Sequence, residues 1–105
     1  MSIFPKIVRR RRDKFVNLHM RVENHGEKAI SGKIKFLVIS PRGKKKKIEE
    51  KVTVQKQSKI DKYYRYPLRK NAIVGRYLVD GRFFFKGGQT KSKTYKTDFF
   101  DVIDE

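Results

Sequence analysis

Hydrophobic side chains alternate with polar ones in several separate stretches of this chain. Residues 15–24 read FVNLHMRVEN, and the hydrophobic side chains of one parity there are Val16, Leu18, Met20 and Val22. A period of two places alternate residues on one face of a β-strand, so this stretch predicts a half-buried antiparallel strand. The Asn-His-Gly sequence that follows is typical of a turn.

The same alternation predicts five further strands. They are expected near residues 30–39, 46–55, 59–68, 76–86 and 92–103. Pro41-Arg42-Gly43 and Gly87-Gly88 provide turns between strands. No stretch keeps a helical period for ten residues, so we expect little helix.

Two residues do not fit simple alternation. Glu50 shares the parity of the inward-facing Ile48 and Val52. Pro67 either ends its strand or marks a sheet edge, because proline cannot donate a backbone hydrogen bond.

Six or seven short strands in about 100 residues predict an all-β fold, an antiparallel β-sandwich. The motif VxLxMxV at 16–22 with Asn24-x-Gly26, and GxIxFxV at 32–38 with SPxG at 40–43, resemble the opening of bacterial immunoglobulin-like domains of the CARDB-like kind. Gly75-x-Tyr77-x-Val79 resembles the tyrosine-corner strand of that superfold, in which the phenol hydrogen-bonds back to the preceding loop. The resemblance covers roughly residues 15 to 103 and implies an immunoglobulin-like fold without implying a function.

Composition raises the question of disorder. The 28 Lys and Arg against 11 Asp and Glu give a net charge of +17, and high net charge is typical of disordered chains. Leu, Ile, Val and Phe nevertheless account for 30 of the 105 residues, above the roughly 20% below which a chain lacks a core. Together with the alternation, this favours a folded domain with a cationic surface.

Residues 1–14, MSIFPKIVRRRRDK, differ from the rest because a short hydrophobic patch precedes four arginines. We expect a basic and apolar N-terminal arm at 1–14 and the immunoglobulin-like sandwich at 15–105. A secretory signal places its charge before a longer apolar core, the reverse of this order. The protein is therefore expected in the cytoplasm, unless it is a fragment of a larger or surface-assembled protein. No apolar run approaches the ~20 residues of a membrane-spanning helix.

Residue types suited to catalysis are scarce. The chain has no cysteine, His19 and His25 are interpreted as a surface and a turn histidine, and no Gly-x-Ser-x-Gly or Ser-x-x-Lys motif indicates a nucleophile. Gly87-Gly88 is interpreted as a hairpin turn, since no helix follows to hold a phosphate. We therefore expect a protein that is not an enzyme and has no cofactor or metal.

The acidic residues near the C-terminus form the one acidic region. It comprises Asp98, Asp101, Asp104 and Glu105. We interpret it as a solvated strand end that attracts the basic remainder of the chain, or alternatively as a docking patch for the arginines of a neighbouring copy.

The basic residues occur in clusters, which favours an acidic protein or a polyanion as partner. Tyr63 is expected outside the core, where it would stack on a base, while Tyr64 and Tyr66 point inward. The candidate residues for binding this partner are Arg9, Arg10, Arg11, Arg12, Lys14, Arg42, Lys44, Lys45, Lys46, Lys47, Lys59, Lys62, Tyr63 and Arg65.

Two functions remain open at this point. The first, slightly favoured, is a structural, assembly or protein-interaction module whose arm orders on an acidic neighbour or builds a homo-oligomer. The second is a polyanion-binding protein, with nucleic acid as one candidate ligand. The sequence does not decide the partner, the oligomeric state, or whether the chain is a whole protein.

Overall fold

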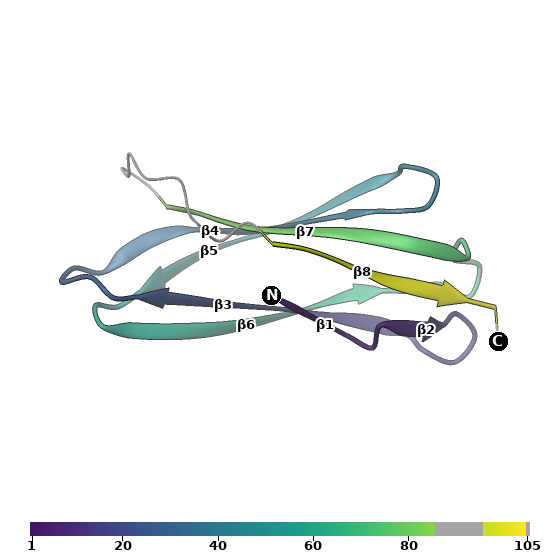
Figure 1. Cartoon of the computed structure of the whole chain (residues 1–105), viewed down its shortest axis with the longest axis horizontal. Coiled ribbons are helices and arrows are strands. Elements are labelled where there is room, and N and C mark those ends of the chain that lie inside the picture. Colours follow the sequence, from purple (N-terminus) through teal and green to yellow (C-terminus); the bar gives the residue numbers. More distant parts are fainter. Residues whose placement is uncertain (86–95, 105) are drawn as a thin grey trace.

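Eight β-strands make up the computed structural model, which describes residues 1–85 and 96–104 and contains no helix within them (Figure 1). The strands are β1 (Ser2–Phe4), β2 (Ile7–Arg9), β3 (Phe15–Asn24), β4 (Ile30–Ile39), β5 (Lys45–Val54), β6 (Ser58–Pro67), β7 (Gly75–Phe85) and β8 (Lys96–Ile103).

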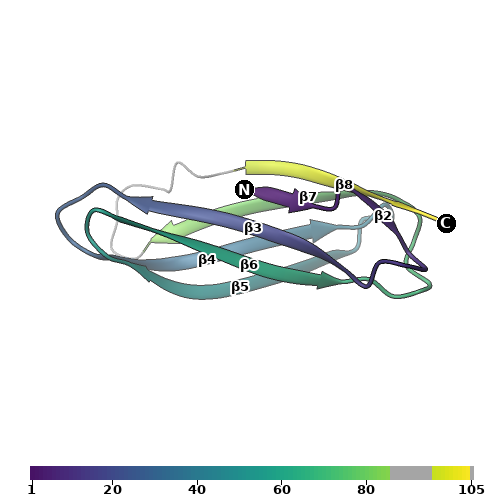
Figure 2. The same ribbon diagram turned by 90° about the horizontal axis from the view of Figure 1, so that it is seen from below.

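The strands form two sheets. One has three strands in the order β1-β3-β6, and the other has five in the order β2-β8-β7-β4-β5. All described pairs are antiparallel except β2 with β8. Figure 2 shows β3 and β6 lying across β4 and β5 of the other sheet. The prediction of an all-β sandwich is thereby confirmed.

The alternating side chains form the core between the sheets. Val16, Leu18 and Met20 of β3 are fully buried. The five-stranded sheet contributes the buried side chains Ile34, Phe36, Val38, Val79, Phe100 and Val102. The six expected strands are present with ends shifted by a few residues. Gly87-Gly88 and the start of the last expected strand lie outside the described residues.

Residues 1–14 belong to the sandwich instead of forming a separate arm. Ile3 of β1 pairs with Leu18, and Val8 of β2 pairs with Val102. Both side chains are buried, with exposed fractions of 5% and 0%. The chain crosses from one sheet to the other at Pro5, which follows a cis peptide bond. Because each short strand fills core space and extends a sheet, these residues pack with the strands that follow them.

The inward parity of Glu50 has a structural reason. Glu50 accepts a hydrogen bond from the Tyr64 hydroxyl and lies 3.6 Å from the Lys62 ammonium. These two residues lie on β6, in the opposite sheet, so Glu50 connects the two sheets. Burial and the hydrogen bond to Glu50 raise the pKa of Tyr64 above its usual value.

Tyr77 makes the hydrogen bond that the resemblance implies. Its hydroxyl donates to the carbonyl oxygen of Ile73 at 2.9 Å, and its ring stacks on Phe100 with 4.9 Å between centroids. Membership of the CARDB-like family stays a prediction, because tyrosine corners recur in unrelated sandwiches.

Candidate functional site

Three loops meet at one end of the sandwich, on the right in Figure 1. They are residues 10–14 between β2 and β3, residues 40–44 between β4 and β5, and residues 68–74 between β6 and β7. The Leu68 amide donates to the Lys14 carbonyl oxygen at 2.8 Å, and the Arg10 guanidinium donates to the Ala72 carbonyl oxygen at 3.0 Å. These bonds connect loops that are far apart in the sequence.

Most of the candidate cations lie at this end. Ten of the fourteen candidate residues are there, together with Arg69 and Lys70. We call this surface the basic end, and its cations are Arg9, Arg10, Arg11, Arg12, Lys14, Arg42, Lys44, Lys45, Lys46, Lys47, Arg69 and Lys70.

Carboxylates neutralise part of the basic end. Asp104 lies 3.0 Å from the guanidinium of Arg10 and 3.4 Å from that of Arg11. Asp101 pairs with Arg76 at 2.9 Å. The hydrogen bonds from Arg10 and Arg76 lower the pKa values of Asp104 and Asp101, respectively. The C-terminal acids thus attract basic residues of their own chain, as the first interpretation of them predicts.

Apart from Arg9, Arg10 and Arg11, the cations of the basic end have no carboxylate partner among the described residues. Lys46 lies over the ring of Tyr66 at 5.4 Å from its centroid. Those with no ion pair in the described part of the chain are Arg12, Lys14, Arg42, Lys44, Lys45, Lys46, Lys47, Arg69 and Lys70. Like charges gathered on one surface create a positive field that attracts anions.

A groove of about 440 Å³ runs through the basic end. The β4–β5 hairpin contributes Lys44, Lys45 and Lys46 to its wall, and the β6–β7 loop contributes Arg69. Tyr66 and Tyr77 also line it. The groove therefore combines a cationic rim with aromatic side chains.

The remaining candidate residues lie elsewhere. Lys62 is bound to Glu50 between the sheets, and Lys59 lies near the opposite end, in register with Glu23. Tyr63 and Arg65 lie on the outer face of the three-stranded sheet. The structure therefore places the four candidate residues of β6 outside the basic end. The reason is that ten residues of extended strand carry β6 along the length of the sandwich.

Arg69 and Lys70 are cations of the basic end that the candidate residues from the sequence do not include. Their signal is present in the sequence, because they follow the strand-ending Pro67 closely in a basic stretch. Only the packing of the 68–74 loop against Lys14 assigns them to the same surface as the arginine run.

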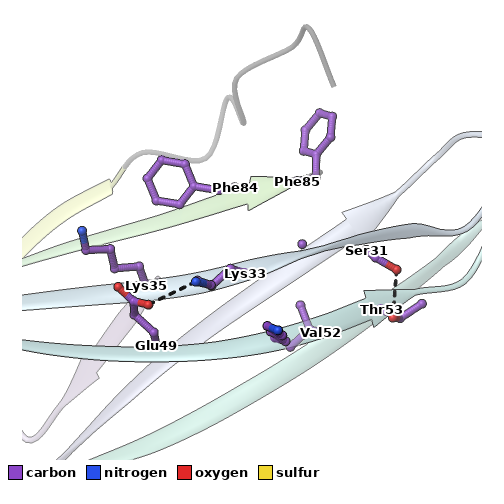
Figure 3. A pocket seen from close by; sticks show the side chains of 10 residues that line it. Ser31, Lys33, Lys35, Glu49, Val52, Thr53, Phe84 and Phe85 are labelled. Atoms are coloured by element: carbon purple, nitrogen blue, oxygen red, sulfur yellow. Dashed lines mark hydrogen bonds and ion pairs between the residues drawn. The ribbon is translucent and has the colours of Figure 1, made fainter. Parts of the chain in front are cut away.

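A second groove, of about 730 Å³, lies toward the opposite end (Figure 3). Phe84 and Phe85 stand on one side of it, and Lys33 and Glu49 form an ion pair of 3.3 Å across β4 and β5. Lys35 and Lys51 add two further cations. This groove is less positive than the basic end, since fewer cations line it and one is neutralised.

Features of a metal site or a membrane span are not found in residues 1–85 and 96–104. There, no group of three or more His, Asp or Glu side chains is placed to hold a metal ion. No helix capable of crossing a bilayer occurs in the same residues.

Comparison with known proteins gives a structural match. No family model matches the chain, and no curated protein sequence matches it. The structure is similar to the alkylpurine DNA glycosylase AlkC of Pseudomonas fluorescens, solved bound to DNA containing an abasic site analog, with a TM-score of 0.71 and 10% identity. The match covers 95% of this chain and 28% of the glycosylase chain. At this identity the match shows a shared fold.

This match corrects the expectation that the protein is not an enzyme. A glycosylase is an enzyme, and almost the whole of this chain has the fold of a part of it. A fold shared at 10% identity assigns no activity to this chain, but the exclusion of enzymes from the sequence alone was wrong. It was based on missing motifs, and a chain of this fold can occur inside a larger enzyme without carrying them.

Proposed function

We propose that this protein is a nucleic-acid-binding β-sandwich that holds phosphate groups at its basic end. The observation that carries the proposal is the meeting of three cationic loops at one end of the molecule, with nine cations that have no carboxylate partner in the described residues. Lys and Arg that contact phosphates release condensed counterions, which is the main source of sequence-independent affinity for nucleic acid.

The structural match supports nucleic acid as the polyanion that this protein binds. The glycosylase with which the chain shares its fold is bound to DNA. Nothing in that likeness identifies the residues that would contact DNA here, so the proposal depends on the charges of this chain.

The proposal predicts that neutralising the basic end weakens DNA binding. The test variant carries Arg42→Gln, Lys44→Gln, Lys45→Gln and Lys47→Gln, all exposed and outside the core. Titration of a labelled duplex at about 50 and about 200 mM salt should show weaker binding of this variant. For this variant, the slope of the logarithm of the association constant against the logarithm of the salt concentration should be shallower by about 0.9 for each phosphate that it no longer neutralises.

A matched control removes four charges from the opposite end through Lys28→Gln, Lys51→Gln, Lys56→Gln and Lys59→Gln. The control has the same net charge as the test variant, so a general electrostatic effect would weaken both equally. Equal losses would contradict a site at the basic end, and undetectable binding of the unmodified protein at the lower salt would remove the proposal.

An assembly role remains the second proposal. Phe4 and Ile7, on either side of Pro5, have exposed fractions of 73% and 63% and offer an apolar contact next to arginines. Ile3 and Val8 are not available for this role because they are buried in the sandwich. Sedimentation of Phe4→Ser/Ile7→Ser beside the unmodified protein tests it, and identical monomer profiles would count against it.

We also propose kinship with the bacterial immunoglobulin-like, CARDB-like domains. The motifs around β3 and β4 support it, as does the hydrogen bond from Tyr77 to Ile73. This proposal concerns ancestry and is independent of the DNA-binding proposal.

A further inference from the structure

We propose that the outer face of the three-stranded sheet stacks the unpaired bases of a single nucleic-acid strand whose phosphates continue to the basic end. This inference rests on the proposed function and assigns its ligand class at an adjoining surface. It is carried by two preformed contacts on that face, one between two rings and one between a guanidinium and a ring, and by their spacing along β6.

The first stack joins Tyr63 of β6 to His19 of β3. The two rings lie 4.6 Å apart between centroids at an angle of 23°, and 68% of Tyr63 is exposed. The His19 ring is held from both sides, because Nδ1 lies 3.1 Å from the Ser2 hydroxyl and Nε2 lies 2.8 Å from Asp61. Tyr63 therefore presents an exposed ring whose position is stabilised by the His19 ring that stacks on it.

The second stack joins Arg65 of β6 to Phe15 at the start of β3. The guanidinium carbon of Arg65 lies 4.5 Å from the centroid of the Phe15 ring. A guanidinium supported in this way is a flat surface on which a base can stack, and it also carries a charge for a phosphate. No ion pair of Arg65 occurs among the described residues, so its charge is not neutralised.

The two stacks favour a single strand over a duplex as the ligand. Tyr63 and Arg65 are two residues apart on one strand, and therefore about 7 Å apart along it. Stacked bases of a duplex are only about 3.4 Å apart on each strand. Both faces of a base inside a duplex are covered by its neighbours, so stacking on Tyr63 and Arg65 requires unpaired bases, and a spacing of about 7 Å fits successive bases of an extended strand.

A hollow of about 670 Å³ connects this face to the basic end. Phe4 and Phe15 line it together with Arg12 and Lys14. Phe4 is 73% exposed and opposes Asn17, which is next to Arg65 in the register. The hollow thus leads from the aromatic side chains of the outer face to Arg12 and Lys14, which have no ion pair in the described residues. A single strand needs both kinds of contact, because its bases stack on aromatic rings and its phosphates bind cations.

The test compares single-stranded and duplex DNA with a variant of the most exposed ring. Tyr63→Ala should weaken binding of a labelled oligothymidine of about 12 nucleotides roughly 5- to 150-fold, the range found when one stacking aromatic is removed. It should leave duplex binding unchanged. Tyr63→Phe keeps the ring and should bind the oligothymidine almost as the unmodified protein does.

The matched control is Leu78→Ala, which removes a half-exposed apolar side chain from the outer face of the other sheet. It should change neither ligand's affinity, and thermal unfolding of each variant establishes that it is folded. Equal affinity of Tyr63→Ala and the unmodified protein for oligothymidine would overturn the stacking face. If the variant with four substitutions in the basic end (the basic-end variant) still loses duplex binding in that case, the proposed function stands without the stacking face. Failure of the unmodified protein to bind either ligand would overturn both.

Discussion

Asp61 shows how a single carboxylate organises the outer face of the three-stranded sheet. It lies opposite Arg21 in the register, accepts a hydrogen bond from the Arg21 guanidinium at 2.9 Å, and contacts His19 at 2.8 Å. The hydrogen bond from Arg21, followed by that from His19, lowers the pKa of Asp61 to about 2. The residue that supports the ring stack is therefore ionised over the whole physiological range.

This shift predicts an acid-dependent loss of stability. A carboxyl whose folded-state pKa is lowered stabilises the fold above its unfolded pKa, near 3.8, and that stabilisation disappears as the pH falls toward about 2. Asp61→Asn should therefore lose less stability than the unmodified protein between about pH 5 and about pH 2.5. Urea unfolding at the two pH values measures this. Equal losses of stability in the two proteins would show that the ion pair contributes nothing.

At the scale of elements, alternation predicted the long strands and failed for the short ones. Strands such as β3 and β6 span ten residues, enough for the period of two to be visible. β1 and β2 have three residues each, and each buries only one side chain. Three residues are too few to show a period. The sequence therefore predicts an arm here, since a proline separates the two segments and four arginines follow.

The burial of these short strands predicts different effects of two isoleucine substitutions. Ile3 is buried against β3, whereas Ile7 is 63% exposed on β2. Ile3→Ala should lower the free energy of unfolding by about 2–5 kcal/mol because it leaves a cavity, and Ile7→Ala by less than about 0.5 kcal/mol. Urea denaturation of both variants tests this. Similar small losses would mean that residues 1–14 do form an arm.

At the scale of the whole molecule, the charge is unevenly distributed. The net charge is +17, and the three cationic loops bring much of it to one end of a molecule whose longest extent is 50 Å. Like charges held close together oppose the compact state. The basic end is therefore expected to cost stability in the absence of a polyanion.

This cost should depend on ionic strength. Raising sodium chloride from about 10 to about 100 mM shortens the screening length from about 30 to about 10 Å, and should raise the midpoint of thermal unfolding. The basic-end variant should gain less from added salt than its control with four substitutions at the opposite end. A midpoint that falls with salt would show that the described ion pairs outweigh the repulsion.

The sequence by itself determined the class of fold and the sign of the surface charge. Alternating residues can bury their apolar side chains only in a sheet with one face covered, and net charge does not depend on folding. Tertiary structure alone decided which charges act together. Arg12, Lys45 and Arg69 are far apart along the chain and reach one surface because three loops emerge at the same end of the sandwich. Lys62, next to Tyr63 in the sequence, is instead bound to Glu50 of the other sheet, because successive side chains of a strand point to opposite faces of its sheet.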